Sequence, residues 1–235
     1  MFKKDIDPKI EEEKIGEHMG VPEGRSLPRS IEKRLDKWGD RVEKYIEPHL
    51  IYEVREILGI DNGTIFLRGG EEIHSRKIAR TLKECDLAVF FIASIGGEVG
   101  DKIDTLSEKN HLSDAYIVDS IGSVAVEDMV ERFHIDMENR YKAAGRSVSA
   151  RFSPGYCDWN IREQETLFSL FDPKRVQVDL TDTFLMQPRK SISGVFGVMP
   201  FYQGRRIDSY LPCFDCAKKD CESRRAKFRK PAGAK

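Results

Sequence analysis

The sequence contains no apolar stretch that approaches the roughly 20 residues a helix needs to span a membrane. Its first residues, Met-Phe-Lys-Lys-Asp-Ile-Asp, lack the apolar segment and the small-residue cleavage site of a secretory signal. The formal net charge is only −1, which argues against a general binder of nucleic acids or membrane surfaces. We therefore expect a cytoplasmic protein whose partners are neither membranes nor nucleic acids.

Cysteine is scarce outside one short segment near the end of the chain. There are five cysteines in 235 residues, and in a reducing compartment we expect thiols rather than disulfides. A domain of this size buries roughly 70% of the surface of its unfolded chain, so it needs neither a metal nor a disulfide merely to fold. We expect an N-terminal arm over residues 1–30, a core over 31–210 and a Cys-rich basic tail over 211–235.

The spacing of apolar residues predicts both helices and strands. Helices are expected over 30–46, 50–58, 75–85, 98–108, 121–140 and 163–171, and strands over 64–67, 87–93, 114–119, 176–180 and 193–198. The uninterrupted apolar run of residues 87–93 predicts a central strand. Because helices and strands do not alternate steadily, the expected fold class is α+β, with a mostly antiparallel or mixed twisted sheet flanked by helices.

A glycine-rich turn follows the strand predicted for residues 87–93. Gly96, Gly97 and Gly100 stand between that strand and the next predicted helix, as in a dinucleotide-binding fold. The leading glycine of the Gly-x-Gly-x-x-Gly fingerprint is missing, although Asp119 lies close to the place of its acidic residue. A tight turn with glycines at positive φ is the favoured interpretation, and a nicotinamide-dependent enzyme is the alternative.

The segment Arg151-Phe-Ser-Pro-Gly-Tyr156 predicts a sharp bend that can hold a small ligand. Proline fixes one φ and glycine permits a left-handed one, so backbone N–H and C=O groups at the bend are left for a ligand. Arg151 can pair with a carboxylate through two parallel hydrogen bonds. Tyr156 offers an aromatic face to an adenine ring or a sulfonium cation. From the residues alone, an ordinary turn with one surface arginine is the alternative.

This segment closely resembles the Arg-Pro-Ala-Pro-Gly-Tyr loop of the activation domain of cobalamin-dependent methionine synthase, a loop that contacts AdoMet beside the cobalamin. Two further stretches agree in order and spacing. Residues 119–127, Asp-Ser-Ile-Gly-Ser-Val-Ala-Val-Glu, are similar to the family's Asp-x-x-Gly-Ser-x-Ala-x-Glu helix start, and residues 191–200 are similar to its late Ser-x-Ser-Gly strand. The resemblance covers residues 85–205, and it implies the family's α+β fold.

The resemblance also implies a cofactor site and a role. The site for S-adenosyl-L-methionine (AdoMet) would be formed by Glu127, Arg151, Ser153, Gly155 and Tyr156, with no catalytic side chain. The chain would serve the reductive reactivation of a corrinoid (cobalamin) methyltransferase, in trans and in methionine synthesis, by presenting AdoMet to the cobalt. Its partners would be a methionine synthase core or another corrinoid-binding methyltransferase, and an acidic electron donor of the flavodoxin or ferredoxin type. The basic residues over 224–230 fit a docking surface for such a donor.

The chain departs from the family pattern at three points. It has no counterpart of the N-terminal Asp-Trp segment, which supplies a further Asp to AdoMet in the family. Met199-Pro200 stands where the methionine synthases have His-Pro, which leaves Tyr202 as an insecure match for the aromatic residue that follows. The Asp-x-His-x-x-Gly signature of a corrinoid carrier is absent, so the corrinoid is expected on another protein.

The tail predicts a metal site. Cys213, Cys216 and Cys221 place three thiols within nine residues, and a Cys-x-x-Cys bend can present two thiolates to one metal ion. Cys157, directly after Tyr156, is the candidate for a fourth ligand. Zinc, an iron–sulfur cluster and simple thiols all stay open, since spacing rarely separates them. An iron–sulfur or zinc-containing electron-transfer or scaffold protein without AdoMet binding is therefore the alternative function. Cys85 is expected to be a small core residue.

Overall fold

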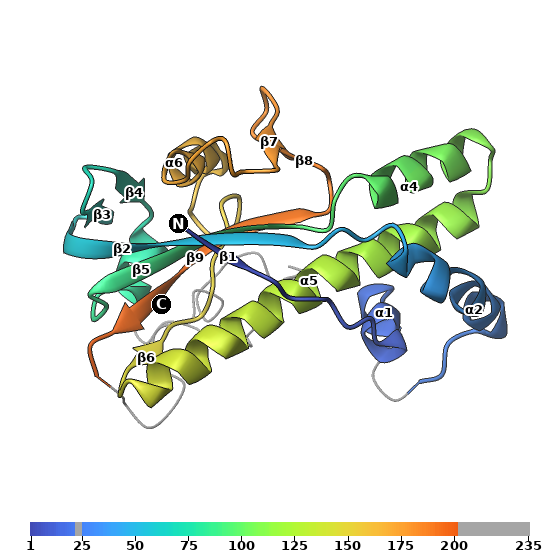
Figure 1. The fold of residues 1–235 in the computed structure, drawn as a ribbon, viewed down its shortest axis with the longest axis horizontal. Coiled ribbons are helices and arrows are strands. Elements are labelled where there is room, and N and C mark those ends of the chain that lie inside the picture. The colour runs from blue at the N-terminus through green and yellow to red at the C-terminus, as the bar shows by residue number, and fades with distance from the viewer. Residues whose placement is uncertain (22–24, 202–235) are drawn as a thin grey trace, which may run out of the picture. The chain divides into compact units, whose positions relative to one another are not determined.

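The computed structural model describes residues 1–21 and 25–201, which Figure 1 draws as a ribbon. They form two compact units, each assembled from separate stretches of the chain. The first unit comprises Met1–Tyr52, Ile92–Ile135 and Lys174–Ile192, and the second comprises Glu53–Phe91, Asp136–Pro173 and, of the described residues, 193–201. Strands β2 (His49–Asp61), β5 (Leu87–Ser94) and β9 (Ser191–Met199) and helix α5 (Leu112–Ala143) contribute to both units.

The main sheet has the strand order β4-β3-β2-β5-β9-β6, and β1 pairs with β2 in addition. The remaining strands are β1 (Phe2–Lys4), β3 (Thr64–Leu67), β4 (Glu72–His74) and β6 (Ser147–Val148). The pairs β1–β2, β2–β3, β3–β4 and β6–β9 are antiparallel. The central position predicted for residues 87–93 is confirmed, because β5 lies between β2 and β9 and is buried from Ala88 to Ser94. The α+β fold class is likewise confirmed.

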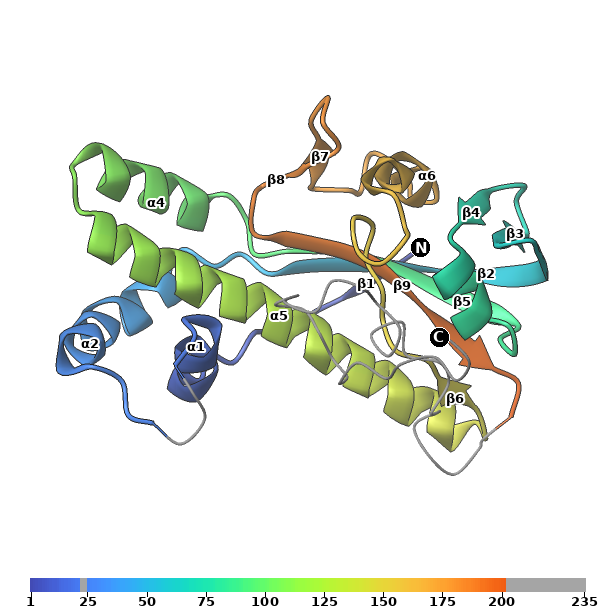
Figure 2. The same ribbon diagram turned by 180° about the vertical axis from the view of Figure 1, so that it is seen from behind.

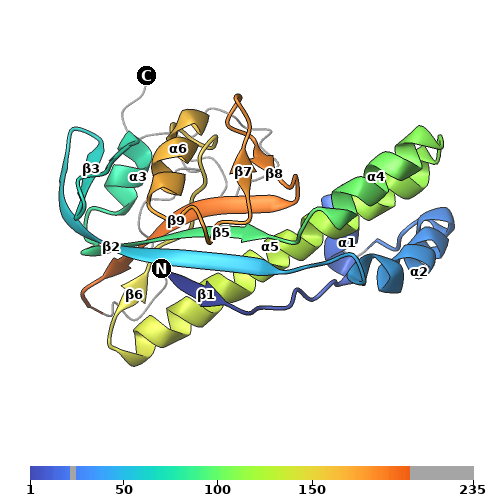
Figure 3. The ribbon, with the colours of Figure 1, turned by 45° about the horizontal axis from the view of Figure 1, so that its top comes forward.

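Helices α1 (Glu12–His18), α2 (Arg29–Glu43) and α4 (Glu98–Glu108) belong to the first unit and lie beside the first half of α5 in two views (Figures 1 and 3). Ion pairs with buried carboxylates of α5 help to hold α1 and α2 against it. Lys14 Nζ on α1 lies 2.8 Å from Asp128 Oδ1, and Arg34 and Lys37 on α2 both contact Asp114. Burial disfavours the charged form of Asp114, but the hydrogen bonds from Lys37 and Arg34 outweigh it and lower the pKa of this carboxyl group.

The N-terminal arm predicted over residues 1–30 contains two ordered elements. Strand β1 pairs with β2 through Phe2–Tyr52 and Lys4–Leu50, and the Phe2 and Tyr52 rings stack 5.0 Å apart. Helix α1 buries Ile15. The domain boundaries at residues 30 and 210 stay predictions, and the second of them lies outside the described residues.

Two secondary-structure predictions were wrong. Residues 50–58 form part of strand β2 instead of a helix, and residues 114–119 belong to helix α5 instead of a strand. In both segments a short apolar run fits either period, so periodicity alone does not decide between them. Pairing with β1 and β3 stabilises the strand, and the buried side chains of Ala115, Ile117 and Val118 continue a helical stripe that goes on through Ile121. Of the strand predicted over 176–180 only β7 (Asp179–Leu180) forms, paired with β8 (Met186–Gln187).

The turn after β5 is a tight strand-to-helix connection, as predicted. Gly96 has a φ of +82°, which a residue with a side chain rarely adopts. Gly97, in contrast, has a φ of −89° and directly precedes α4. Helix α4 has the bounds predicted for it.

Two glycines of β9 lie where no side chain would fit. A Cβ atom on Gly194 would lie 2.5 Å from the Phe152 carbonyl oxygen and 2.7 Å from Cζ of Phe91. A Cβ atom on Gly197 would lie 2.4 Å from Sγ of Cys85. At Gly194 and Gly197, strand β9 therefore packs against its neighbours in the second unit too closely to leave room for a side chain.

We predict that Gly194→Ala lowers the free energy of unfolding by about 2 kcal/mol, because the backbone carbonyl of Phe152 cannot yield as a flexible side chain would. Gly59→Ala in β2 is the matched control: its Cβ would meet nothing within 4 Å, so a change below about 0.5 kcal/mol is expected. Denaturant unfolding followed by circular dichroism measures both variants. Equal midpoints for the two would contradict the close packing at Gly194.

Candidate functional site

The segment 151–156 is attached to strand β9 in the second unit. Phe152 and Val195 form an antiparallel bridge in which each backbone N–H donates to the other residue's carbonyl oxygen at 2.8 Å. Just before it, Ser149 N–H donates to the Gly197 carbonyl oxygen at 2.9 Å, and Gly197 N–H donates to Ser149 Oγ at 2.8 Å. In Figure 2 the segment is the yellow trace between β6 and helix α6 (Gln164–Ser169). The start of the segment is therefore fixed by backbone hydrogen bonds.

The sharp bend predicted at Pro154-Gly155 is confirmed. Tyr156 N–H donates to the Ser153 carbonyl oxygen at 3.3 Å and Gly155 N–H donates to the Trp159 carbonyl oxygen at 2.8 Å. Gly155 and Cys157 both have a left-handed φ, of +90° and +59°. Gly155, Tyr156 and Cys157 are exposed, with 51% of the Tyr156 surface accessible, while Arg151 and Ser153 are half-buried. The tip thus presents an aromatic ring to solvent.

The end of the same segment is held by residues that sequence reasoning missed. The Asp158 carboxylate accepts hydrogen bonds from Ser75 Oγ at 2.5 Å and from the Lys77 backbone N–H at 3.2 Å. Trp159 beside it is 1% exposed. No local signal in the sequence could have revealed this contact, because Ser75 and Asp158 are 83 positions apart.

The Ser-x-Ser-Gly stretch of β9 is used in packing. Ser193 Oγ donates to Gln164 Oε1 at 2.7 Å in a buried hydrogen bond that joins β9 to α6 in the second unit. Ser191, in the first unit, donates to the Pro188 carbonyl oxygen at 2.7 Å, and its hydroxyl oxygen lies 2.9 Å from that of Ser94. Each polar side chain of the stretch therefore has a partner within its own unit.

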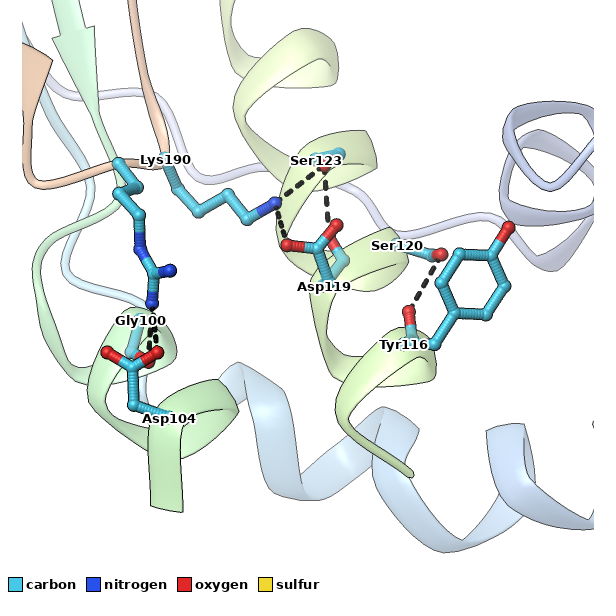
Figure 4. Close-up of polar contacts among 8 residues, drawn as sticks. Gly100, Asp104, Tyr116, Asp119, Ser120, Ser123 and Lys190 are labelled. Carbon is cyan, nitrogen blue, oxygen red and sulfur yellow. Dashed lines mark hydrogen bonds and ion pairs between the residues drawn. The ribbon is translucent and has the colours of Figure 1, made fainter. Parts of the chain in front are cut away.

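Glu127 lies on α5 in the first unit, where the stretch 119–127 also has a structural role. Figure 4 shows the Lys190 ammonium between Asp119 and Ser123, with Nζ 2.7 Å from Asp119 Oδ1 and 2.8 Å from Ser123 Oγ. A Cβ atom on Gly122 would lie 2.9 Å from Cγ1 of Val99 and 3.4 Å from the Lys190 side chain. Gly122 thus lets Val99 of α4 and Lys190, which directly precedes β9, approach α5. Glu127 follows Ser123 by four residues, on the same side of the helix, and is exposed.

The structure therefore brings together Arg151, Ser153, Gly155 and Tyr156 in one loop of the second unit. Glu127 belongs to the first unit, so its proximity to that loop stays a prediction. That all five residues form one ligand site likewise stays a prediction.

The comparison with protein families identifies the chain. The family described as the activation domain of vitamin B12-dependent methionine synthase matches residues 83–204, slightly more than half of the sequence. This chain belongs to that family. The match includes the stretch 119–127, the loop 151–156 and the whole of β9, so the resemblance drawn from these motifs is confirmed.

A solved structure of the MetH reactivation domain bound to AdoHcy is similar to this activation-domain chain, with a TM-score of 0.54 and 16% sequence identity. The alignment covers 78% of this chain, and the chain spans 65% of the length of that domain. At this identity the likeness establishes the fold. No curated protein matches the chain.

Two of the five cysteines of the activation-domain chain, Cys85 and Cys157, lie in the described part of the structure. Cys85 is a core residue as predicted, and burial raises the pKa of its thiol to about 12. Cys157 is exposed at the tip of the loop, whereas Cys213, Cys216 and Cys221 lie outside the described residues. Within residues 1–21 and 25–201 there is no cluster of three or more His, Cys, Asp or Glu side chains able to hold a metal ion.

No helix in the described part of this chain is both long and apolar enough to cross a membrane.

The contact of Lys190 with α5 makes a testable prediction. Lys190→Met keeps the apolar stem over Gly122 but removes the ammonium from Asp119 and Ser123, and we expect a loss of about 1 kcal/mol in unfolding free energy. The neighbouring Arg189→Met is the control. The side chains of Arg189 and its partner Asp104 are 54% and 60% exposed, against 12% for Lys190, so its loss should stay below about 0.5 kcal/mol. Equal losses of unfolding free energy in Lys190→Met and Arg189→Met would refute the stabilising role of the Lys190 ammonium.

Proposed function

We propose that this chain binds AdoMet and takes part in the reductive reactivation of a cobalamin-dependent methionine synthase. The observation that carries the proposal is the family match over residues 83–204, which contains an arginine- and tyrosine-bearing loop with an exposed tip. The bound AdoHcy in the similar MetH reactivation domain supports it, because AdoHcy is what AdoMet becomes when it loses its methyl group.

The residues proposed for the site suit the charges of AdoMet. Its amino-acid end carries an ammonium and a carboxylate, and its sulfur carries a positive charge. Arg151 can pair with a carboxylate, Glu127 with a cation, and the exposed Tyr156 ring can lie against adenine or the sulfonium. Backbone groups at Ser153 and Gly155 can contribute hydrogen bonds. The five residues would bind and orient AdoMet, and no general acid or base is required of them.

The reaction that the site would serve is the transfer of a methyl group from AdoMet to cobalt. An inactive cobalt(II) corrinoid on the partner would take one electron from a donor protein to give cobalt(I). Cobalt(I) would then supply the electron pair for the new carbon–cobalt bond, while the carbon–sulfur bond of AdoMet breaks and AdoHcy leaves. Because the methyl transfer is irreversible, it draws the unfavourable reduction forward. The chain would contribute position and electrostatics.

The partners follow from this role. We propose that the corrinoid is presented by a separate domain or protein, a methionine synthase core or a related methyltransferase. The electron donor would be an acidic protein of the flavodoxin or ferredoxin type, because residues 224–230 are rich in Lys and Arg. That segment lies outside the described residues.

Calorimetric titration with AdoMet tests the site. We expect the wild-type chain to bind, and Arg151→Ala and Glu127→Ala each to weaken binding by roughly tenfold, since each removes a charge-assisted hydrogen bond. Arg162→Ala and Glu108→Ala are matched controls, because both residues are exposed in their own unit and neither belongs to the proposed site. Unchanged affinity in both site variants would remove the assignment.

Reactivation of a candidate corrinoid protein, under reducing conditions and with AdoMet, tests the role itself. The wild-type chain should restore activity to the cobalt(II) form. Tight AdoMet binding without reactivation of a methionine synthase core would point to a different corrinoid methyltransferase.

We further propose that Cys157 and the cysteines of 213–221 bind one metal centre, zinc or an iron–sulfur cluster, in support of the same role. The support is the spacing of the three tail cysteines and the exposed position of Cys157.

Metal analysis of anaerobically purified protein should find zinc or iron in stoichiometric amount, with brown colour if the centre is a cluster. Cys157→Ser should lower the content, because it removes one thiolate ligand. Protein that is free of both metals after anaerobic purification would contradict the proposal.

A further inference from the structure

The loop 151–156 is fixed at both ends but exposed in the middle. At one end Phe152 is bridged to Val195 on β9. At the other end, immediately after the exposed tip, Asp158 is hydrogen-bonded to the segment that starts helix α3 (Arg76–Thr81). The ring of Tyr156 lies between these two attachments, so its position depends on both.

The hydrogen-bond directions at Asp158 are fully determined. Ser75 Oγ accepts from the Ile78 N–H at 3.1 Å, so the single hydroxyl proton of Ser75 remains for the Asp158 carboxylate. The Lys77 N–H is shared between the two carboxylate oxygens, at 3.2 Å from the second oxygen and 3.4 Å from the one that Ser75 contacts. A carboxylate offers an accepting oxygen on both sides, whereas an amide is uncharged and would place a donating NH2 group where one of these oxygens lies. Asp158 is therefore matched to these two donors in a way that Asn is not.

The backbone next to Asp158 needs this attachment. Cys157 has a left-handed φ of +59°, which is uncommon for a residue with a side chain, and Gly155 two positions earlier is also left-handed. A conformation of this kind persists where the surrounding contacts hold it. Asp158 follows Cys157 directly, and buried Trp159 donates its backbone N–H to the Tyr156 carbonyl oxygen at 3.0 Å. The Asp158 contacts thus restrain the backbone directly after the tip.

A second carboxylate strengthens the same attachment. Glu163 Oε2 accepts a hydrogen bond from the His74 backbone N–H at 3.3 Å. Two acidic residues of the stretch 158–163 therefore bind His74, Ser75 and Lys77 at the junction of β4 and α3. We call the stretch 158–163 the clamp, because its two carboxylates hold the chain after the exposed tip against residues 74–77.

We propose that Asp158 is a positioning residue of the AdoMet site, acting through Tyr156 and held by Ser75. This inference rests on the proposed function, because it assumes that the tip contacts AdoMet. The Asp158 carboxylate is bound by Ser75 and Lys77, so Asp158 acts through the loop and not by contact with AdoMet. Its contribution is to keep the tyrosine ring in the binding position before AdoMet arrives, which reduces the entropy lost on binding.

Two measurements on the full chain test the proposal. Calorimetry gives the AdoMet affinity, and hydrogen exchange read by mass spectrometry compares peptides of the loop 151–157 with peptides of β5. Asp158→Ala should weaken AdoMet binding roughly tenfold and speed exchange in the loop while β5 stays protected. Asp158→Asn should recover part of both effects, since its amide oxygen still satisfies one donor. Glu165→Ala, at an exposed acidic position on α6, should leave both measurements unchanged.

A double-mutant cycle shows whether the two residues act as one. Ser75→Ala should weaken AdoMet binding by a similar factor, and the Ser75→Ala/Asp158→Ala pair should be no weaker than the worse single variant. Fully additive losses would overturn the role of Ser75 as the holder of Asp158.

The outcomes separate this proposal from the proposed function. A wild-type chain without AdoMet affinity overturns the proposed function and the positioning role together. Wild-type binding with unchanged loop exchange in Asp158→Ala overturns the clamp alone. Faster loop exchange with full AdoMet affinity overturns the positioning role and leaves the clamp and the AdoMet site standing.

Discussion

The backbone bridge between Phe152 and Val195 is the constraint on which the candidate loop depends. Its two hydrogen bonds of 2.8 Å place the start of the loop directly against strand β9. This approach requires a residue without a side chain at Gly194, because the Phe152 carbonyl and the Phe91 ring occupy the space that a Cβ would need. The glycine of the Ser-x-Ser-Gly stretch thus allows the loop to pack directly against β9.

The stretch 119–127 has a comparable double character. Asp119 and Ser123 hold the ammonium of Lys190, and Gly122 admits Val99. These residues are occupied within the first unit, so they are not the ones left for a ligand. Glu127, one turn further along the same side of the helix, is exposed. The motif therefore combines residues that pack the unit with Glu127, the residue proposed to bind AdoMet.

The proposed chemistry asks little of individual side chains. Methyl transfer from a sulfonium to cobalt(I) needs no proton transfer, so the protein would act by orientation and by matching charges. A loop fixed at both ends and exposed at its tip suits that task, because a ring held in place before binding loses less entropy when the ligand arrives. The hydrogen bonds of Asp158 attach the loop to the start of α3, and the bridge at Phe152 attaches it to β9.

Much of the architecture could be read from the sequence. The apolar run of β5, the helix after Gly97 and the bend at Pro154-Gly155 depend on residues that are neighbours in the chain, so local patterns predicted them correctly. The same local patterns failed for β2 and for residues 114–119, where a short apolar run suits either period and strand pairing or helical packing decides.

The sequence by itself determined the family, through three motifs and their spacing, and with it the class of ligand to expect. Only the tertiary structure decided how the loop is held, because Asp158 and Ser75 are 83 positions apart and Phe152 pairs with Val195 of a strand that is distant in the sequence. Hydrogen bonds between distant residues leave no periodic trace in the chain. They exist only once the strands and helices have packed, and for this reason no pattern of neighbouring residues could have revealed them.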